Sequence, residues 1–509
     1  MMRLAFPVAL LAIALAAPAP AQPLRTTAAA EPSWAAASAE VEARARAAGR
    51  QPRARNVILF IGDGMGISTV TAARIFEAQQ RAKAAGGSFP GFGGGEENRL
   101  VFERFPHAAL VKTYNTNAQV PDSAGTATAM TTGTKTRIGV LGLLPGQGPE
   151  TCRTPEAFPK PLARLARESG LAVGIVTTTR ITHATPAAMF AHVPNRDWEA
   201  ADRDYPVEAR ASGCPDIAAQ LTGFSGGLDV ALGGGLARFR PVSAGGTRDD
   251  GRDLIAEWQK ADPRARFVGD SAGLSALDPA APGPVLGLFN PSHLDFAFDA
   301  DRTKEPSLAD MTRFAIRKLA AESRRRPGRG YVLMVEGGRI DHAHHLTNAY
   351  RALDETVEFA RAIEAAQALV DPRDTLILVT ADHSHVFTIA GYPPRGNPIL
   401  GFLRPIPGGE GRTRTDADGN ALDEDGRPIT TLGYANGPAS VRIGERTLDS
   451  NRAPTDPDYL QAKTHRLMSE THGGEDVGLW ATGPGSALVS GTLEQNAIFH
   501  VIARALGWR

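Results

Sequence analysis

Four nearly continuous apolar runs constrain the fold of this 509-residue chain more than any other feature. They occupy residues 56–61, 172–178, 331–335 and 375–380. None shows the alternation of polar and apolar residues that is expected of a sheet with one face in water. We therefore expect four strands that are buried on both faces, which is typical of a parallel sheet.

Helical patterns lie between these runs, at residues 69–85, 161–169, 308–323 and 350–369. Their apolar residues recur at the three- and four-residue spacing of a helix with one buried face. Strands that alternate with helices indicate a parallel sheet covered by those helices. The predicted fold class is therefore α/β, a three-layer sandwich with a central mostly parallel sheet between helices.

Composition excludes some classes of protein. The chain has 55 Lys and Arg residues against 55 Asp and Glu residues, so no overall charge favours a polyanion and we expect no nucleic acid partner. Beyond the N-terminus, no apolar stretch reaches the ~20 residues that cross a bilayer.

The N-terminus has the pattern of an export signal. It holds a positive charge at Arg3, a short apolar stretch at residues 4–17 and an Ala-Pro-Ala sequence at residues 19–21. We predict a signal peptide over residues 1–21; the alternative, an N-terminal membrane anchor, would need a longer apolar run. No nearby cysteine could carry a lipid, and the C-terminus lacks a hydrophobic tail. We expect an exported protein, periplasmic or secreted, with no stable membrane anchor.

Export bears on the two cysteines, Cys152 and Cys214. Oxidising compartments preserve disulfides, so we predict that these residues are bonded to each other. Neither lies in a spacing typical of metal binding. Two buried free thiols are the alternative.

Two segments differ from the rest of the chain. Residues 22–54 are rich in Ala, Arg and Glu and predict an N-terminal tail that leads into one helix, at about residues 34–48. In residues 391–469, Pro, Gly, Asp and Arg crowd together with only short apolar pieces. We predict a small irregular surface insertion there, within a domain that spans residues 55–509.

Carboxylates follow three of the predicted strands. Asp63, Glu336 and Asp382 stand just beyond their carboxyl ends, where open parallel sheets bind ligands, and Asp341 comes shortly after Glu336. A single carboxylate in such a place could cap a helix or pair with a basic side chain. Four in one cleft need cations. Mixed His and carboxylate ligands suit zinc and all-oxygen ligands suit magnesium, and both stay open at this point.

Spacing helps to choose among the histidines. If the segment after Asp341 starts a helix, Asp341 and His345 lie one turn apart on one face, whereas His342 and His344 point elsewhere. We therefore predict Asp341 and His345 as a pair of metal ligands. Alternatively, His342, His344 and His385 do not bind metal but support the ligands or the surrounding structure.

Ser123 is a candidate nucleophile. It precedes a run of small residues, so it is expected at a helix N-terminus, where amide groups and the helix dipole favour anions. Alternatively, Asp122 or Ser123 only caps that helix. No motif ties a histidine to Ser123, so a metal would have to activate it. Arg180 and Arg196 could each bind phosphate, and the residue pattern alone does not choose between them.

Together these motifs resemble the alkaline phosphatase family, and details such as His183 and His342 are closer to its animal-type branch. The insertion and the cysteine pair are also similar to features of that branch, whereas Asn290 stands where a carboxylate of its extra calcium site is expected. The matching segments appear in family order: residues 56–66, 121–124, 336–342, 380–385 and 471–472.

The resemblance implies a phosphomonoesterase that forms a phosphoserine intermediate, binds two Zn²⁺ and one Mg²⁺, and is homodimeric. Its substrates would be small phosphate monoesters. Ser123 resembles the nucleophile and Arg196 the arginine that binds phosphate. The residues that match metal ligands are Asp341, His345 and His472 for the first zinc, Asp382, His383 and Asp63 for the second, and Asp63, Glu336 and Thr185 for magnesium, with His183 beside it.

Three other functions compete with this interpretation. A sulfatase would need a cysteine or serine in a C/S-x-P-x-R sequence, and neither cysteine nor Ser123 has one. A phosphodiesterase differs in pocket depth, which the sequence does not show. A non-catalytic metal-binding protein would have no need of Ser123 and Arg196.

Overall fold

The computed structural model describes most of the chain: residues 24–49, 51–87, 94–148, 152, 157–203, 205–406 and 414–508. The predicted signal peptide, residues 1–21, lies outside the described residues.

Ten strands of the described chain form one central sheet, in the order β17-β2-β16-β8-β1-β7-β3-β4-β6-β5. The four predicted strands lie side by side at its centre and are parallel to one another. Each begins at the predicted residue and continues one or two residues further. They are β8 (Thr375–Ala381), β1 (Asn56–Gly62), β7 (Tyr331–Gly337) and β3 (Ala172–Arg180).

Shorter strands extend the sheet on both sides. Three parallel strands follow β3, and three strands follow β8, of which only β16 is antiparallel to its neighbours. The six are β4 (Val230–Gly234), β6 (Val285–Leu288), β5 (Arg266–Val268), β16 (Val477–Thr482), β2 (His107–Lys112) and β17 (Thr492–Glu494). The predicted mostly parallel sheet is confirmed.

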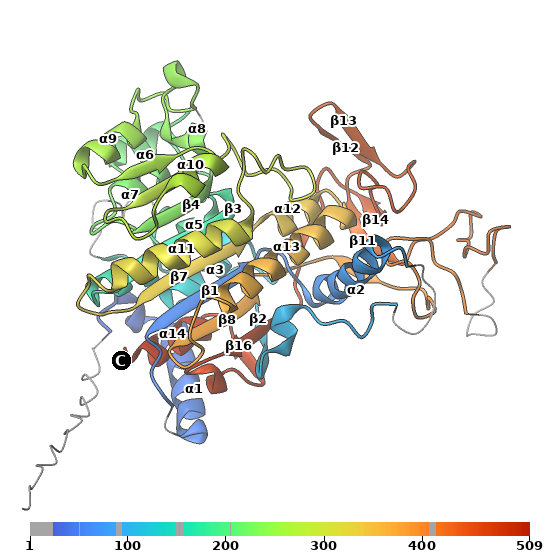
Figure 1. Cartoon of the computed structure of the whole chain (residues 1–509), viewed down its shortest axis with the longest axis horizontal. Helices are drawn as coiled ribbons and strands as arrows, with labels where there is room; N and C mark the ends of the chain where they lie inside the picture. The colour runs from blue at the N-terminus through green and yellow to red at the C-terminus, as the bar shows by residue number, and fades with distance from the viewer. Residues whose placement is uncertain are drawn as a thin grey trace, which may run out of the picture.

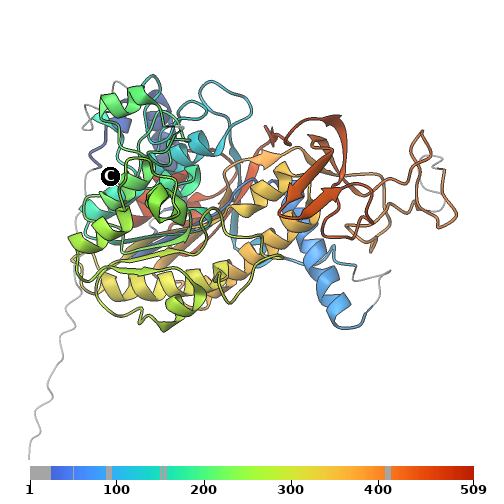
Figure 2. The same cartoon turned by 90° about the horizontal axis from the view of Figure 1, so that it is seen from above.

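Helices cover both faces of this sheet (Figures 1 and 2). On one face, α11 (Leu308–Ser323) and α13 (Ala349–Gln367) pack on the central strands, and α2 (Ile67–Ala84) packs on α13. The helices of the other face are α3 (Ser123–Thr132), α4 (Leu162–Glu168), α5 (Ala184–Ala187) and α14 (Ala497–Leu506), with α1 (Pro32–Ala48) packed against α14.

Small helices gather beside β4, β6 and β5 (Figure 1). They are α6 (Val207–Ser212), α7 (Ile217–Thr222), α8 (Leu236–Phe239), α9 (Leu254–Ala261) and α10 (Ser271–Ala276). Cys214, between α6 and α7, forms the predicted disulfide with Cys152. Within the described residues, no helix combines the length and the apolar character that a membrane span needs.

The segment 391–469 is more ordered than its composition predicts. One strand just before it, β10 (Phe387–Ile389), pairs with β11 (Leu432–Gly437), and β11 pairs with β14 (Ala462–Arg466). A separate hairpin joins β12 (Ser440–Ile443) to β13 (Arg446–Asp449). These strands are too short and too interrupted by glycine and proline to give a periodic sequence signal. They project from one end of the sheet (Figure 1).

Candidate metal centre

Three adjacent strands bring three buried carboxylates together. Ile61 of β1 is level with Glu336 of β7, and Gly62 is level with Ala381 of β8. Asp63 and Asp382 therefore follow the carboxyl ends of neighbouring strands. The side chains of Asp63, Glu336 and Asp382 are fully buried. This convergence is what the apolar runs and their terminal residues predicted.

A first group forms where α12 (Arg339–His345) follows β7. Asp341 and His345 face one another across one helical turn, with Nε2 of His345 3.3 Å from Oδ1 of Asp341. A two-stranded pairing of β15 (His472–Gly473) with β9 (Ser384–His385) adds His472, whose Nε2 lies 3.4 Å from the same oxygen. We call Asp341, His345 and His472 the Asp341 cluster.

The tautomers of this cluster show that it fits a cation. Nδ1 of His345 lies 2.6 Å from the backbone oxygen of Glu470, and Nδ1 of His472 lies 2.8 Å from that of Pro121. A carbonyl only accepts, so both Nδ1 atoms carry hydrogen and, in the neutral rings, both Nε2 atoms carry lone pairs. These two Nε2 atoms are 3.2 Å apart and face Asp341. Three electron-pair donors that converge in this way suit a metal ion.

A second group lies beside Ser123. Nε2 of His383 is 3.4 Å from Oδ1 of Asp63 and 3.4 Å from Oδ2 of Asp382. Nδ1 of His383 faces the backbone oxygen of Ser384 at 3.3 Å, which again leaves Nε2 as the lone pair. Asp63, Asp382 and His383 form the Asp382 cluster, and they too fit a metal ion.

A third group consists of unpartnered atoms. Oδ2 of Asp63, Oε1 of Glu336, Oγ1 of Thr185 and Nδ1 of His183 are buried, and no hydrogen-bond partner for them lies among the described residues. Asp63, His183 and Glu336 each place one ligand atom within 4.8 Å of the others. We call Asp63, Glu336, Thr185 and His183 the Glu336 cluster. Because buried polar atoms are rarely left unpaired, this cluster is a third place for a cation.

The raised pKa values of the Asp63 and Glu336 carboxyls also indicate a site that favours cations. Burial raises the pKa of the Asp63 carboxyl well above its ordinary range, and the carboxylates of Asp382, Asp341 and Glu336 raise it further. Burial raises the pKa of Glu336 to about 7, against hydrogen bonds from the hydroxyls of Thr177 and Thr179. Positive charge among these groups would favour their ionised forms.

Asp341 is in a different environment. Burial alone would raise the pKa of its carboxyl, but His345, His385 and His472 together hold that pKa well below the ordinary range. His385 donates from Nε2 to Asp341 and from Nδ1 to Glu470, and these two carboxylates raise the pKa of His385 to about 10 despite burial. His385 thus lies between two carboxylates, those of Asp341 and Glu470.

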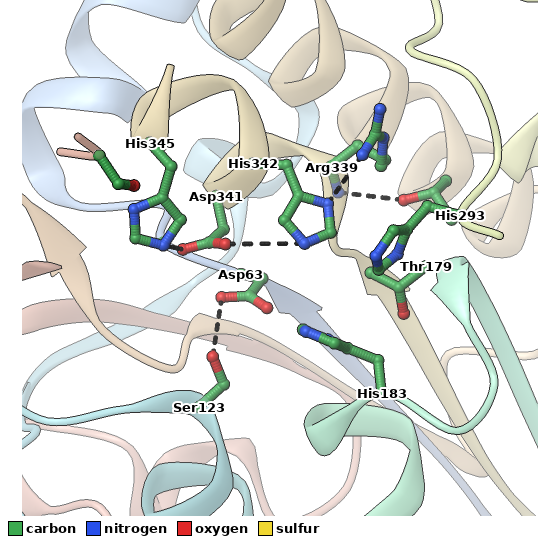
Figure 3. Close-up of polar contacts among 12 residues, drawn as sticks. Asp63, Ser123, Thr179, His183, His293, Arg339, Asp341, His342 and His345 are labelled. Atoms are coloured by element: carbon green, nitrogen blue, oxygen red, sulfur yellow. Dashed lines mark hydrogen bonds and ion pairs between the residues drawn. The ribbon is translucent and has the colours of Figure 1, made fainter. Parts of the chain in front are cut away.

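Ser123 is the first residue of α3. The preceding residue, Asp122, caps that helix by accepting a hydrogen bond from the backbone of Gly125 at 3.0 Å. The hydroxyl of Ser123 is left facing the site, 3.1 Å from Nε2 of His383. It also lies 3.5 Å from Oδ1 of Asp63 (Figure 3). Of the two N-cap candidates, Asp122 and not Ser123 caps the helix.

Arg196 lies across a small hollow from Ser123. It donates to Oδ2 of Asp122 at 3.1 Å and to Nε2 of His183 at 3.0 Å. Arg180 also borders the hollow, but both oxygens of Glu199 bind its guanidinium, at 2.7 and 2.6 Å. The hollow measures about 330 Å³, and the clusters supply Asp341, His345, His472 and His183 to its wall.

The other histidines of the motifs have distinct partners. His342 accepts from Arg339 at 3.0 Å and lies 3.9 Å from Oδ2 of Asp341 (Figure 3). His344 is held between the hydroxyls of Thr69, at 2.9 Å, and Tyr434, at 2.7 Å. With both ring nitrogens bonded, His344 has the structural role that was the alternative for it.

Glu470 is a residue of the site that the sequence pattern did not predict. It is 1% exposed and contacts both His345 and His385. Its position two residues before His472 was the one available signal, and it adjoins a segment that composition assigned to the surface.

The chain matches a family model described as Alkaline phosphatase over residues 54–508. The chain belongs to the alkaline phosphatase family. Membership carries the activity of the family, the metal-dependent hydrolysis of phosphate monoesters, and the predicted resemblance is confirmed.

Individual members of the family agree. The tissue-nonspecific alkaline phosphatase of Gallus gallus is 44% identical over 468 residues, which cover 89% of this chain and 84% of that protein. The same isozyme of Homo sapiens is 43% identical, with 89% of this chain and 83% of that protein covered. Among solved structures, the alkaline phosphatase of Thermus thermophilus is similar at a TM-score of 0.61 and 26% identity, with 90% of this chain and 92% of that one covered. The predicted likeness to animal-type members is thus confirmed.

Proposed function

We propose that the hollow between Ser123 and Arg196 is the active site, and that hydrolysis there forms a phosphoserine on Ser123. The observation that carries this proposal is the placement of the Ser123 hydroxyl. It lies at a helix N-terminus, 3.1 Å from Nε2 of His383 and 3.5 Å from Oδ1 of Asp63. A hydroxyl held against two such ligand atoms is in reach of the ion that they would bind.

We infer two zinc ions and one magnesium ion. Histidine and carboxylate together suit zinc, which assigns zinc to the Asp341 cluster and to the Asp382 cluster. The Glu336 cluster offers two carboxylates and the hydroxyl of Thr185, and oxygen ligands suit magnesium. We place His183 beside this ion rather than on it. Its Nε2 accepts a hydrogen bond from Arg196, so in the neutral ring Nδ1 carries the hydrogen and has no lone pair for a metal.

The residues of the chain divide the work of two displacement steps. Bound zinc supplies Lewis-acid stabilisation of charge on the serine and phosphate oxygens. Arg196 presents parallel N–H groups to two phosphate oxygens, and Asp122 keeps it aimed at them. Oγ of Ser123 loses its proton and forms a bond to phosphorus as the bond to the alcohol oxygen breaks, and the alcohol oxygen takes up a proton. Water then loses a proton as its oxygen bonds to phosphorus, the bond to Oγ breaks, and Oγ takes up a proton as inorganic phosphate is released.

Trapping the intermediate tests this assignment. Wild-type protein is mixed with a generic aryl phosphate and quenched in acid, and its peptides are weighed; we predict phosphate on Ser123. Ser123→Ala should lose both the label and about all turnover while it keeps its metal. Ser384→Ala is the matched control, because that buried hydroxyl binds Glu475 at 2.6 Å instead of facing the hollow. Serine labelling at the wild-type level in Ser123→Ala would refute the proposal.

We also propose that the protein is exported and works as a homodimer without a stable membrane anchor. The pattern of residues 1–21 supports export, as does the disulfide between Cys152 and Cys214, because oxidising compartments preserve such bonds. The homodimer follows from the family resemblance.

A further inference from the structure

Glu470 is a buried carboxylate that binds histidines rather than a lysine or arginine. Its Oε2 lies 2.6 Å from Nδ1 of His385, and its Oε1 accepts from the backbone of Val386 at 2.9 Å. Its backbone also binds His345 twice. Its oxygen accepts from Nδ1 of His345 at 2.6 Å, and its N–H donates to the backbone oxygen of His345 at 3.0 Å.

His385 links Glu470 to Asp341 by hydrogen bonds from its two ring nitrogens. Its Nε2 donates to Oδ1 of Asp341 at 2.9 Å. The ring has little freedom to turn, because it stacks on His344 at 4.8 Å between centroids and lies so close to Gly64 that any side chain at Gly64 would overlap it. A carboxylate that fixes Nδ1 therefore fixes the direction in which Nε2 points.

Glu470 thus supports two residues of the Asp341 cluster. Its backbone oxygen holds the ring of His345, and its side chain holds Oδ1 of Asp341 through His385. Those two residues are 3.3 Å apart at the point where their lone pairs converge. Partners behind the ligands commonly set metal affinity by fixing the orientation of the ligands.

We propose that Glu470 is a positioning residue for the metal held by the Asp341 cluster. This inference rests on the proposed function in one respect, the assignment of zinc to that cluster. Through Glu470, the loop before His472 orients two of the three ligands, His345 and Asp341, so that the cluster is preorganised before the metal binds.

Two substitutions distinguish a role of Glu470 in orienting the metal ligands from a role in stabilising the fold alone. Glu470→Ala removes the partner of His385 and should weaken zinc binding about 10- to 100-fold. Glu470→Gln should keep most of the affinity. Its amide can donate to Nδ1 of His385 while its oxygen accepts from Val386, and Nε2 of His385 then still donates to Asp341.

Glu475→Ala is the matched control. This exposed carboxylate lies in the same loop and binds the hydroxyl of Ser384, the neighbour of His385, at 2.6 Å. It touches no residue of the Asp341 cluster, so zinc affinity should stay at the wild-type value.

The measurements are zinc affinity, by competition with a chromogenic chelator, and the visible spectrum of the Co²⁺-substituted protein, which reports ligand geometry. Weaker binding and an altered spectrum in Glu470→Ala alone would support the proposal. Wild-type affinity in Glu470→Ala, or equal losses in Glu475→Ala, would overturn it. If Glu470→Ala does not fold, Glu470→Asp carries the test, because its shorter side chain withdraws from His385 and should also weaken binding. A wild-type protein that binds no zinc would overturn the proposed function as well.

Discussion

At the level of single residues, the site is defined by histidine nitrogens whose lone pairs point into the metal clusters. His345, His472 and His383 each turn Nδ1 to a backbone oxygen and leave Nε2 for the centre of its cluster. Backbone carbonyls thus select the tautomer that a metal needs. Asp63 stands between two of the clusters, with Oδ1 toward His383 and an unpartnered Oδ2 near Glu336.

Asp63→Ala should therefore cost more metal than substitution of a residue in one cluster. We predict that it loses the ions of both the Asp382 cluster and the Glu336 cluster, and that turnover falls by several orders of magnitude. Asp382→Ala, which removes a ligand from one cluster, should keep more metal. Metal analysis of the purified variants checks this, and equal metal content in the two would contradict the bridging role.

At the scale of elements, the strands place the carboxylates of the site, and the helices carry titratable side chains that are shielded from solvent. Glu355 of α13 is 3% exposed and accepts from the backbone of Ala297 at 2.6 Å. Burial raises the pKa of Glu355 to about 8 from an ordinary value of 4.5; Asp354 and Glu358 add to the rise, and the same backbone bond and Arg339 oppose it.

The sign of the resulting pH effect follows from proton binding. Between pH 4.5 and 8 folded Glu355 retains a proton that the unfolded chain has released, so stability falls as pH rises through this window. Glu355→Gln keeps an acceptor for Ala297 and removes the titration. We predict equal melting temperatures for variant and wild type near pH 5, and a variant more stable by a few kcal/mol at pH 9.

Thermal unfolding at the two pH values measures this effect. Glu364→Gln, an exposed change on the same helix, is the control and should follow the wild type at both. A Glu355→Gln variant that gains nothing at pH 9 would show that folding does not raise the pKa of Glu355.

At the scale of the whole molecule, the sequence was most informative where burial is complete. The four central strands could be predicted because both of their faces are buried. By contrast, β2 alternates between buried and exposed residues, and β17 has only three residues. The pairing of His472 with His385 is a tertiary contact, which no local pattern signals. Glu470 was missed for the same reason, since it reaches Asp341 only through His385.

The disulfide is the one covalent link between distant parts of the fold. Cys152 and Cys214 are 62 residues apart, and closure of such a loop stabilises the folded state by about 4 kcal/mol in the chain-entropy model. We predict that Cys152→Ser/Cys214→Ser lowers the melting temperature by several degrees with metal content unchanged. Reduction of the wild type should lower it equally, and an unchanged melting temperature in both samples would contradict this contribution.

We infer that three clusters hold metal and that Ser123 and Arg196 act with this metal on phosphate monoesters. The most direct test is metal analysis of the purified protein, paired with its rates on a phosphate monoester, a diester and a sulfate ester at alkaline pH. We predict about two zinc ions and one magnesium ion per chain, with the monoester rate dominant. Bound metal without monoester turnover would show that the clusters bind metal but that Ser123 and Arg196 do not hydrolyse phosphate monoesters.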